Sequence, residues 1–323
     1  MERRELGRSG VKVSSIGLGT FTWGLSTRPD DAALQVRAYL DAGGNLLDTA
    51  DIYAAGAAET IVGGLFGKVI SRDQVVLATK AVGVLDGGRP RSDASAGHLR
   101  QALDDSLRRL NTDHLDLWQL HAWDPAVPLE ETLSAVEEAL RSGRVRHAGV
   151  CNYAGWQTMK ASVLQTANGH PLASTQVEYS LLERGIEREV LPAAADQGIG
   201  VLAWAALGRG VLTGKYREGV PEKRRNNPMF QAYAGRFLDD RSAAVVETVA
   251  TVADELGVPP LAVALAWVRD RPGVTTALIG ARNIDQLRQS LAPETDGLVL
   301  PEAAVRTLDE VSKPHRGYPE AGV

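Results

Sequence analysis

Short apolar runs alternate with amphipathic segments along most of the chain. The apolar runs have the length of β-strands and occupy residues 15–19, 45–48, 75–80, 115–120, 145–150, 173–177, 200–204 and 274–279. The segments between them show the apolar spacing of helices and occupy residues 30–42, 59–66, 99–110, 129–140, 156–164, 187–196 and 243–256, with a further helix at 261–269. In one of them, apolar side chains recur at Leu99, Leu103, Leu107 and Leu110. This alternation predicts a parallel sheet with helical crossovers.

The number of strand–helix units favours a closed (β/α)8 barrel, the TIM-barrel fold, over an open sheet. Such a barrel takes roughly 250 residues, and the chain has 323. No linker rich in Pro, Gly and Ser divides the sequence, so we expect a single domain over residues 1–323. The turn Ser9-Gly10 between two short runs predicts an N-terminal β-hairpin outside the barrel, and residues 217–240 predict a long irregular loop.

Polar or aromatic side chains stand at the ends of six successive predicted strands. They are Asp48, Lys80, His121, Asn152, Gln176 and Trp204. A (β/α)8 barrel collects the carboxyl ends of its strands at one mouth, and that mouth carries the catalytic groups. Any one of these residues also fits a solvated strand end. Their occurrence on successive strands indicates a shared site.

Four residues near this mouth form a set that suits protonation of a carbonyl oxygen. Lys80 beside Asp48 would stay charged, and its cation would lower the pKa of Tyr53 from its ordinary value of about 10. A tyrosine tuned in this way can act as a general acid near neutral pH. His121 can hydrogen-bond the carbonyl oxygen as negative charge develops there. Taken singly, each also fits a structural role, such as a cap, a solvated terminus or core packing.

The residues that carry this pattern resemble the aldo-keto reductase family. The resemblance rests on residues 48–53 (Asp-Thr-Ala-Asp-Ile-Tyr), 78–80 (Ala-Thr-Lys) and 115–121 (Leu-Asp-Leu-Trp-Gln-Leu-His), and it extends from residue 6 to residue 282. It implies a (β/α)8 barrel that uses NADPH to reduce aldehydes or ketones to alcohols. It also implies that Tyr53 is the proton donor, that Lys80 and Asp48 tune it, and that His121 orients the carbonyl.

The resemblance further implies where the nicotinamide end of the cofactor binds. Asn152 and Gln176 match positions that hold the carboxamide, and Trp204 matches the aromatic residue that stacks on the nicotinamide. The other contacts expected near this end are Gly19, Thr20 and Asp48. Two residues depart from the usual pattern without removing its chemistry: Cys151 stands in place of a serine, and Trp204 in place of a tyrosine.

Two further segments are similar to those that hold the phosphates and the adenosine. Residues 207–215 resemble the loop that straddles the pyrophosphate, where glycines let backbone N–H groups approach phosphate. The contacts expected there are Leu207, Gly208, Arg209, Gly210 and Leu212. Residues 280–290 resemble the adenosine-binding segment, with Gly280, Arg282, Gln286 and Ser290 as expected contacts. Arg282 suits a 2′-phosphate because a guanidinium pairs with phosphate bidentately, which is why we expect NADP(H). Gln286 and Ser290 replace the Arg and Asn common in the family.

Aromatic side chains are the candidates for a substrate pocket. We expect Phe21, Trp23 and Trp123 to line it together with Tyr53 and His121. The further candidates are Tyr179, Met229 and Phe230. Such a mouth suits an apolar or aromatic carbonyl compound better than a free sugar, although rim packing fits each aromatic residue equally well.

Composition and charge narrow the remaining possibilities. The net charge of −5, with both signs spread along the chain, argues against binding to nucleic acid or to a membrane surface. The single cysteine excludes an intramolecular disulfide, and the six scattered histidines lack metal-ligand spacing, so no metal is expected. Without a secretory or membrane-spanning apolar stretch, a cytoplasmic protein is expected. The sequence predicts no oligomeric state.

Two alternatives to a carbonyl reductase stay open. One is a cofactor-binding, redox-sensing regulatory partner. The other is a tailoring reductase that acts on a nucleotide sugar or a natural product.

Overall fold

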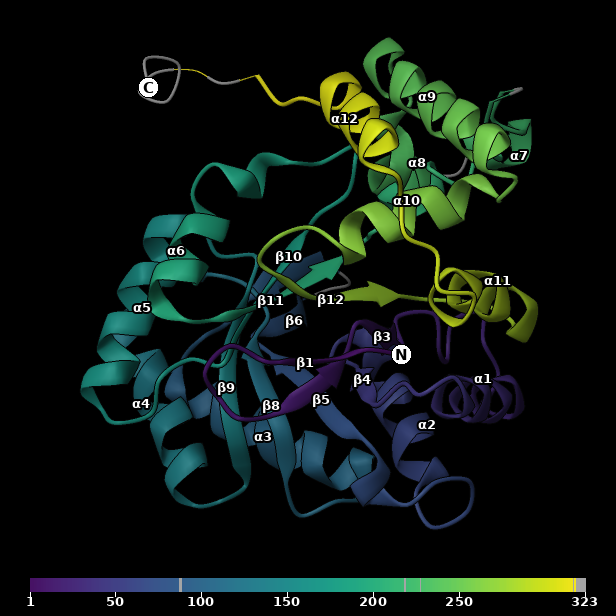
Figure 1. The fold of residues 1–323 in the computed structure, drawn as a ribbon. Coiled ribbons are helices and arrows are strands. Elements are labelled where there is room, and N and C mark those ends of the chain that lie inside the picture. Colours follow the sequence, from purple (N-terminus) through teal and green to yellow (C-terminus); the bar gives the residue numbers. More distant parts are fainter. Residues whose placement is uncertain (87–88, 218, 227, 316, 318–323) are drawn as a thin grey trace.

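Eight parallel strands close into a barrel, as the alternation of the sequence predicts (Figure 1). The computed structural model describes the chain except for residues 87–88, 218, 227, 316 and 318–323. The barrel strands are β3 (Ile16–Gly19), β4 (Leu46–Asp48), β5 (Val76–Ala81), β8 (Leu115–Leu120), β9 (Val145–Cys151), β10 (Ser174–Glu178), β11 (Gly200–Trp204) and β12 (Val274–Ile279). Each pairs in parallel with the next barrel strand along the chain, and β12 pairs with β3 to close the sheet. The prediction of a TIM barrel is confirmed.

Helices surround the barrel on the outside (Figure 1). They are α1 (Pro29–Asp41), α2 (Ala57–Leu65), α3 (Ala96–Leu110), α4 (Leu129–Arg141), α5 (Gly155–Ala167), α6 (Val190–Gln197), α9 (Asp240–Leu256), α10 (Pro260–Arg269), α11 (Ile284–Thr295) and α12 (Glu302–Val311). Helix α3 shows why the bounds fall where they do. The Ser95 side chain accepts the His98 N–H at the N-terminus, and Asn111 adopts a left-handed conformation at the C-terminus.

Several elements lie outside the strand–helix repeat. The predicted N-terminal hairpin is present as β1 (Arg3–Glu5) paired with β2 (Lys12–Ser14). A second hairpin, β6 (Gly83–Asp86) with β7 (Arg89–Ser92), follows β5 and was not expected from the sequence. The prediction of an irregular loop at residues 217–240 is wrong in part, because this segment contains α7 (Glu222–Arg225), α8 (Pro228–Ala234) and the 3-10 helix η5 (Gly235–Phe237). These short helices lack apolar periodicity, and Tyr233 of α8 contacts Arg209 and Phe21 in the loops that follow β11 and β3.

The hairpin of β1 and β2 lies across one end of the barrel (Figure 1). Its Leu6 and Val13 are buried together with Leu46 of β4, Leu117 of β8 and Leu202 of β11. Burial of these apolar side chains stabilises the fold and closes the barrel interior at that end. The carboxyl ends of the strands form the opposite end, where the candidate site lies.

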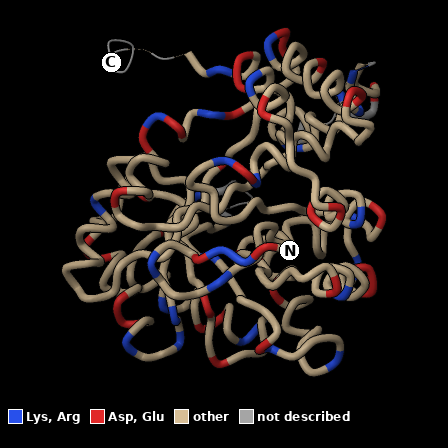
Figure 2. Tube along the Cα trace, in the orientation of Figure 1, with Lys and Arg blue, Asp and Glu red and all other residues tan. Residues whose placement is uncertain are grey.

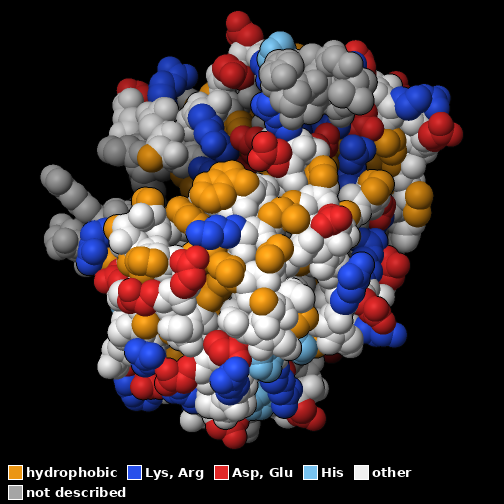
Figure 3. All heavy atoms as spheres, turned by 90° about the vertical axis from the view of Figure 1, so that its left-hand side faces the viewer, with side chains coloured by type: hydrophobic (Ala, Val, Ile, Leu, Met, Phe, Trp, Pro, Cys, Tyr) orange, Lys and Arg blue, Asp and Glu red, His pale blue; other side chains and the backbone are white. Residues whose placement is uncertain are grey.

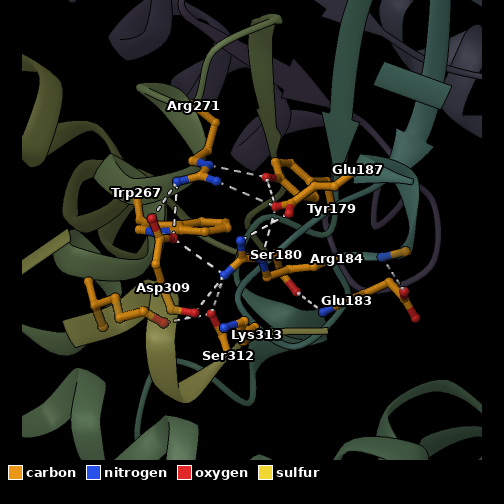
Figure 4. A network of polar contacts seen from close by, with 12 residues as sticks. Tyr179, Ser180, Glu183, Arg184, Glu187, Trp267, Arg271, Asp309, Ser312 and Lys313 are labelled. Carbon is orange, nitrogen blue, oxygen red and sulfur yellow. Dashed lines mark hydrogen bonds and ion pairs between the residues drawn. The ribbon is translucent and has the colours of Figure 1, made fainter. Parts of the chain in front are cut away.

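A buried polar network attaches α12 to the barrel (Figure 4). Arg184 donates to both carboxylate oxygens of Glu187, at 2.8 and 2.9 Å. Arg271 donates to both oxygens of Asp309 in α12, at 3.0 and 2.9 Å. The two guanidinium groups lie over the ring of Trp267, whose N–H donates to Asp309 at 3.0 Å. Because each buried charge has a partner, the network fixes the last helix without leaving an uncompensated ion.

Charged side chains of both signs are interspersed over the fold (Figure 2). The side that carries α4, α5 and α6 shows the same mixture around a central group of hydrophobic side chains (Figure 3). Trp156 and Val163, both on α5, are 59% and 54% exposed. Among the described residues, no single helix has the length and apolar character of a membrane span, and α9 with α10 reaches them only as a pair bent by 101°.

Candidate active site

Lys80 and Asp48 form a buried ion pair at the ends of neighbouring strands. The Lys80 Nζ donates to Asp48 Oδ2 at 2.6 Å and to the Thr49 carbonyl at 2.8 Å. Lys80 is fully buried and Asp48 is 3% exposed. Burial acts to lower the pKa of Lys80, but the Asp48 carboxylate opposes it, and the pKa ends above its ordinary value. Lys80 is therefore a permanent cation at the barrel mouth.

Tyr53 begins the 3-10 helix η1 (Tyr53–Gly56), five residues after the end of β4. The Lys80 Nζ lies 3.4 Å from its hydroxyl oxygen. Burial raises the pKa of Tyr53 to about 12, although Lys80 acts to lower it. The prediction that Lys80 brings this pKa below 10 is therefore wrong, because withdrawal of the phenolate from water outweighs the nearby cation. Tyr53 keeps its proton throughout the neutral range, as a proton donor must.

His121 follows β8 directly, and its ring centre lies 5.9 Å from that of Tyr53, with 74° between the planes. Burial and the Lys80 charge lower the pKa of His121 to about 3. The imidazole is thus neutral near pH 7. A neutral imidazole still carries one N–H, which can donate to a carbonyl oxygen.

The lowered pKa of His121 predicts a pH-dependent contribution to stability. The unfolded chain takes up this proton below the ordinary pKa of 6.5, whereas the folded protein resists it down to about 3. The contribution is therefore present above pH 6.5 and is lost progressively as the pH falls from there toward 3. Between pH 7 and pH 5, we expect the wild type to lose about 2 kcal/mol more unfolding free energy than His121→Gln. Urea unfolding at both pH values measures this, and equal losses in the two proteins would contradict it.

Amide side chains link the other strand ends to the ion pair. Gln176 of β10 donates to Asp48 Oδ1 at 2.8 Å. Gln119 of β8, which was not predicted from the sequence, donates to the same oxygen at 3.4 Å. The alternation of inward and outward side chains along β8 was the available signal, since Gln119 is a fully buried polar residue within the strand. Asp48 thus accepts hydrogen bonds from three strands besides its own.

Asn152 connects His121 with Trp204. Its amide donates to the His121 carbonyl at 2.9 Å and accepts the Trp204 indole N–H at 3.0 Å. Asn152 follows β9, and Trp204 ends β11. The structure therefore brings together all six residues that the sequence places at strand ends.

Strained backbone conformations follow three of these strands. Val82, Asn152 and Ala205 come just after β5, β9 and β11, with φ of 101°, 58° and 55°. A positive φ is unusual for any residue with a side chain, and for the β-branched Val82 it is an outlier. Such strain persists where surrounding contacts hold it, and it concentrates at functional sites. Its position here supports a functional mouth.

The predicted pyrophosphate loop follows β11 as the 3-10 helix η4 (Gly208–Gly210). Its three residues all have positive φ, at 55°, 56° and 88°. Arg209 donates to both carboxylate oxygens of Glu178 at 2.8 and 2.7 Å, so its guanidinium already has an anionic partner. Leu207 is half-buried next to this turn.

Two details of the loop prediction need correction. Leu212 is fully buried, and its N–H donates to the Leu207 carbonyl at 3.2 Å, so neither its side chain nor its N–H faces a ligand. The N–H groups of Gly208 and Gly210 also donate within the loop, to Ala205 and Leu207. The expectation that these N–H groups face phosphate is wrong for this conformation, because the tight turn uses them internally.

The predicted adenosine contacts lie at the start of α11. The Arg282 side chain is exposed. Its N–H donates to the Gln286 side chain at 3.1 Å. Ser290, one turn later on α11, is 5% exposed and faces inward. Gly280 lies beside Gly19, because β12 and β3 are neighbours and a Cβ at Gly280 would stand 3.7 Å from the Gly19 carbonyl.

Thr20 directly follows β3 and is fully buried. Its N–H donates to the Asp48 carbonyl at 2.9 Å. Its hydroxyl has no hydrogen-bond partner within the described part of the chain. A buried hydroxyl without a partner costs free energy, so an unpaired one beside the site points to a bound group that satisfies it.

Phe21 lies beside Tyr53, with its ring centre 5.2 Å from that of Tyr53 in an edge contact. Trp123 packs edge-on against Tyr153 and Trp156, at 5.2 and 5.4 Å between ring centres. The structure also stacks Tyr233 of α8 on Phe21, at 6.0 Å and 11°. The position of Tyr233 was not predicted, because nothing in the pattern of residues 217–240 shows which side chains return to the barrel.

Two predicted pocket residues lie in the core instead. Trp23 is fully buried, and its indole N–H donates to Gln35 at 3.3 Å. Tyr179 is also fully buried and donates to Glu187 at 2.5 Å, within the network that holds α12. Both assignments to the pocket are wrong, since neither ring has an exposed face. Phe230 packs on Tyr216 at 5.5 Å, and the side chain of Met229 lies outside the described ones.

Cys151, which ends β9, is buried, and burial raises the pKa of its thiol above the ordinary value. The thiol is therefore neutral and a weak nucleophile. In the described ranges, no three His, Cys, Asp or Glu side chains are grouped so that they could hold a metal ion.

Comparisons with known proteins agree with this geometry. The model of the Aldo/keto reductase family matches residues 15–313. The "Uncharacterized oxidoreductase YrpG" of Bacillus subtilis is 37% identical, over 90% of this chain and 90% of its own length. The "Protein tas" of Escherichia coli is 33% identical, over 98% of this chain and 99% of its own. The "Aldo-keto reductase YhdN" of Bacillus subtilis is 36% identical, over 89% of this chain and 87% of its own. The chain therefore belongs to the aldo/keto reductase family.

Proposed function

We propose that this oxidoreductase uses NADPH to reduce an aldehyde or ketone to an alcohol, with Tyr53 as the proton donor. The observation that carries the proposal is the position of one buried cation. Lys80 lies within hydrogen-bond distance of both Asp48 and the Tyr53 hydroxyl, at 2.6 and 3.4 Å. Tyr53 is protonated at neutral pH, so it has a proton to donate. The fixed Lys80 cation beside it would stabilise the phenolate that forms when this proton passes to the substrate oxygen.

Each of the four side chains has a distinct task in this mechanism. When bound, NADPH would supply a hydride to the carbonyl carbon. The Tyr53 hydroxyl donates a hydrogen bond to the carbonyl oxygen and then transfers its proton to it. Lys80 stabilises the resulting phenolate, and Asp48 holds Lys80 in position. The neutral His121 donates a second hydrogen bond to the oxygen as negative charge develops. Solvent returns a proton to Tyr53 after the alcohol leaves.

The residues at the mouth fit a nicotinamide cofactor. Thr20 offers a buried hydroxyl that lacks a partner among the described residues. Gln176 uses its N–H for Asp48, which leaves its amide oxygen to accept from a carboxamide. Trp204 has the Arg209 guanidinium over its ring at 5.2 Å, so a nicotinamide would pack on the opposite face. The indole N–H of Trp204 donates to Asn152 Oδ1, which fixes the ring.

Turnover with a panel of aldehydes and ketones tests this proposal, with NADPH and NADH compared side by side. We expect alcohol formation coupled to NADPH oxidation. Tight binding of NADPH with no alcohol from any member of the panel would overturn the proposal and favour a redox-sensing partner. The panel includes larger natural-product ketones, because a tailoring reductase would act on those alone.

The preference for NADPH over NADH rests on Arg282. Its exposed guanidinium is available for a 2′-phosphate, which NADH lacks. A charge-assisted bidentate pair contributes roughly 1.5–3 kcal/mol, so we expect Arg282→Gln to raise the KM for NADPH about tenfold or more and to leave the KM for NADH unchanged. Steady-state kinetics with both cofactors measures this. Equal increases for the two would remove Arg282 from the 2′-phosphate site.

A further inference from the structure

Two threonines in the loop after β3 contact the predicted adenosine segment. The strands β3 and β12 are paired, so the loops that follow them start at the same edge of the barrel. Thr22 donates from its hydroxyl to the Ala281 carbonyl at 2.9 Å. The Thr27 hydroxyl lies within donating distance of two carbonyls, those of Ala281 at 3.3 Å and Arg282 at 3.2 Å. The loop after β3 is therefore attached to the backbone of the residue that is proposed to bind the 2′-phosphate.

The turn between residues 22 and 27 places the two hydroxyls together. The Thr27 N–H donates to the Thr22 carbonyl at 3.0 Å, and the two Oγ1 atoms are 3.0 Å apart. The Gly24 N–H donates to the Thr27 carbonyl at 3.0 Å. Thr27 is 2% exposed, so water does not compete for its hydroxyl. This hydroxyl is a fixed donor and not a surface group.

The backbone of Arg282 is held on both sides of its Cα. Its carbonyl accepts from Thr27, and its N–H donates to Gln286 Oε1 at 3.1 Å. The Gln286 N–H in turn donates to Asn283 Oδ1 at 3.0 Å, at the N-terminus of α11. Ala281, the preceding residue, is 1% exposed. The Arg282 side chain is exposed, but it extends from a backbone fixed between the loop after β3 and α11.

We propose that Thr27 is a positioning residue for Arg282, and that through Arg282 it raises the affinity for the 2′-phosphate of the cofactor. This inference rests on the proposed use of NADPH. A guanidinium pairs with phosphate through two parallel N–H groups, so the pair needs one orientation of the arginine. The arginine stem is flexible, and a fixed Cα lowers the conformational entropy that is lost on binding. Thr27 acts by holding the backbone, without touching the phosphate.

Binding of adenosine 2′,5′-bisphosphate and adenosine 5′-monophosphate tests this without turnover. The two ligands differ only in the 2′-phosphate, and calorimetry gives the ratio of their dissociation constants. Thr27→Val removes the hydroxyl and keeps the branched shape of the side chain. We expect it to weaken binding of the bisphosphate about fivefold, the effect of one hydrogen bond, and to change binding of the monophosphate less than about twofold. Thr27→Ser keeps the hydroxyl and should keep the wild-type ratio. An unchanged ratio in Thr27→Val would overturn the proposal.

A combination with Arg282→Gln shows whether Thr27 acts through Arg282. In that background we expect Thr27→Val to leave the ratio of the two dissociation constants unchanged, because the guanidinium that it positions is absent. A general defect of the loop would weaken binding of the bisphosphate by the same factor in both backgrounds. Equal effects of Thr27→Val with and without Arg282 would therefore overturn the proposal.

Thr132→Val is the matched control for loss of a buried hydroxyl. Thr132 of α4 is also 2% exposed, and its hydroxyl donates to the Ala94 carbonyl at 2.9 Å. We expect this variant to lose stability but to keep the wild-type ratio of the two ligands. A fivefold change here as well would show that the effect follows from lost stability, and it would overturn the assignment to Thr27.

Thr22→Val tests the same attachment at a less buried position, in case Thr27→Val does not fold. Thr22 contacts the carbonyl of Ala281 and not that of Arg282, so we expect a smaller loss of bisphosphate affinity, about twofold. No loss in Thr22→Val would overturn the view that the loop after β3 holds Arg282 in place.

Activity measurements separate failure of this inference from failure of the proposed function. If the wild type prefers the bisphosphate and Thr27→Val loses that preference, but no carbonyl compound is reduced, the proposed reduction fails and the positioning role stands. If the wild type reduces carbonyl compounds with NADPH but Thr27→Val keeps the preference, only the positioning role is wrong. A wild type that binds both ligands equally would overturn the positioning role together with the 2′-phosphate site.

Discussion

We expect Tyr53→Phe to lower kcat for carbonyl reduction by about two to four orders of magnitude, the range that general acid catalysis contributes. The variant loses one hydroxyl, which is the group 3.4 Å from Lys80 Nζ. The ring and its contact with Phe21 are kept, so the fold and the affinity for NADPH should change little. Steady-state kinetics and NADPH titration measure the two quantities separately.

Tyr39→Phe is the matched control for this experiment. Tyr39 is another fully buried tyrosine, and its hydroxyl donates to the carbonyls of Ile16 and Leu46, at 2.9 and 3.1 Å, away from Lys80. We expect it to lose stability but to keep the wild-type kcat. If both variants lost activity equally, the effect of Tyr53 would come from disturbed packing, and its role as acid would be contradicted.

The second large effect concerns the buried ion pair. We expect Lys80→Met to lower the free energy of unfolding by about 3–5 kcal/mol, because it leaves the carboxylate of Asp48 buried without its cation. Within the described part of the chain, the Asp48 carboxylate would keep only the amide hydrogen bonds from Gln176 and Gln119. Amide donors cannot replace a full charge in a site that excludes water. Denaturant unfolding of the variant and the wild type measures the loss.

The double variant Asp48→Asn with Lys80→Met supplies the control. It removes both charges and keeps an oxygen at position 48 that can accept from Gln176. We expect it to recover most of the stability that Lys80→Met loses, although neither protein should reduce carbonyls. If the double variant were as unstable as Lys80→Met alone, the loss would come from the missing lysine side chain and not from an unpaired charge.

The barrel could be predicted because its signals are local. Each strand is a short apolar run, and each helix has its own apolar face, so the alternation is visible without knowing which elements touch. The residues of the mouth could be predicted for a related reason. A parallel barrel places every carboxyl strand end on the same side, so Asp48, Lys80 and His121 had to meet once the strands were located.

Burial and long-range contacts could not be predicted in the same way. Trp23 follows β3 just as Phe21 does, but one ring is fully buried against Gln35 and the other is 47% exposed. Tyr233 lies in a segment without apolar periodicity, and only its contacts with Arg209 and Phe21 bring it to the mouth. Tertiary packing decides such positions, and sequence spacing does not record it.

The raised pKa of Tyr53 is a second property that could not be predicted from the sequence. The sequence pattern places the Lys80 cation near Tyr53, and a cation there favours the phenolate form of Tyr53. The opposing cost of burial depends on how much water the folded mouth admits, and it raises the pKa to about 12. The presence of a cation near Tyr53 was therefore predictable from residue types, whereas the balance between charge and desolvation was not.

Single-turnover hydride transfer tests the central claim most directly, because product release often limits kcat and can mask the chemical step. The complex of the protein with NADPH is mixed rapidly with excess benzaldehyde, and NADPH absorbance is followed for the wild type and Tyr53→Phe. The account predicts one fast turnover in the wild type, and a step slower by about two to four orders of magnitude in the variant. Equal rates in the two proteins would contradict Tyr53 as the proton donor.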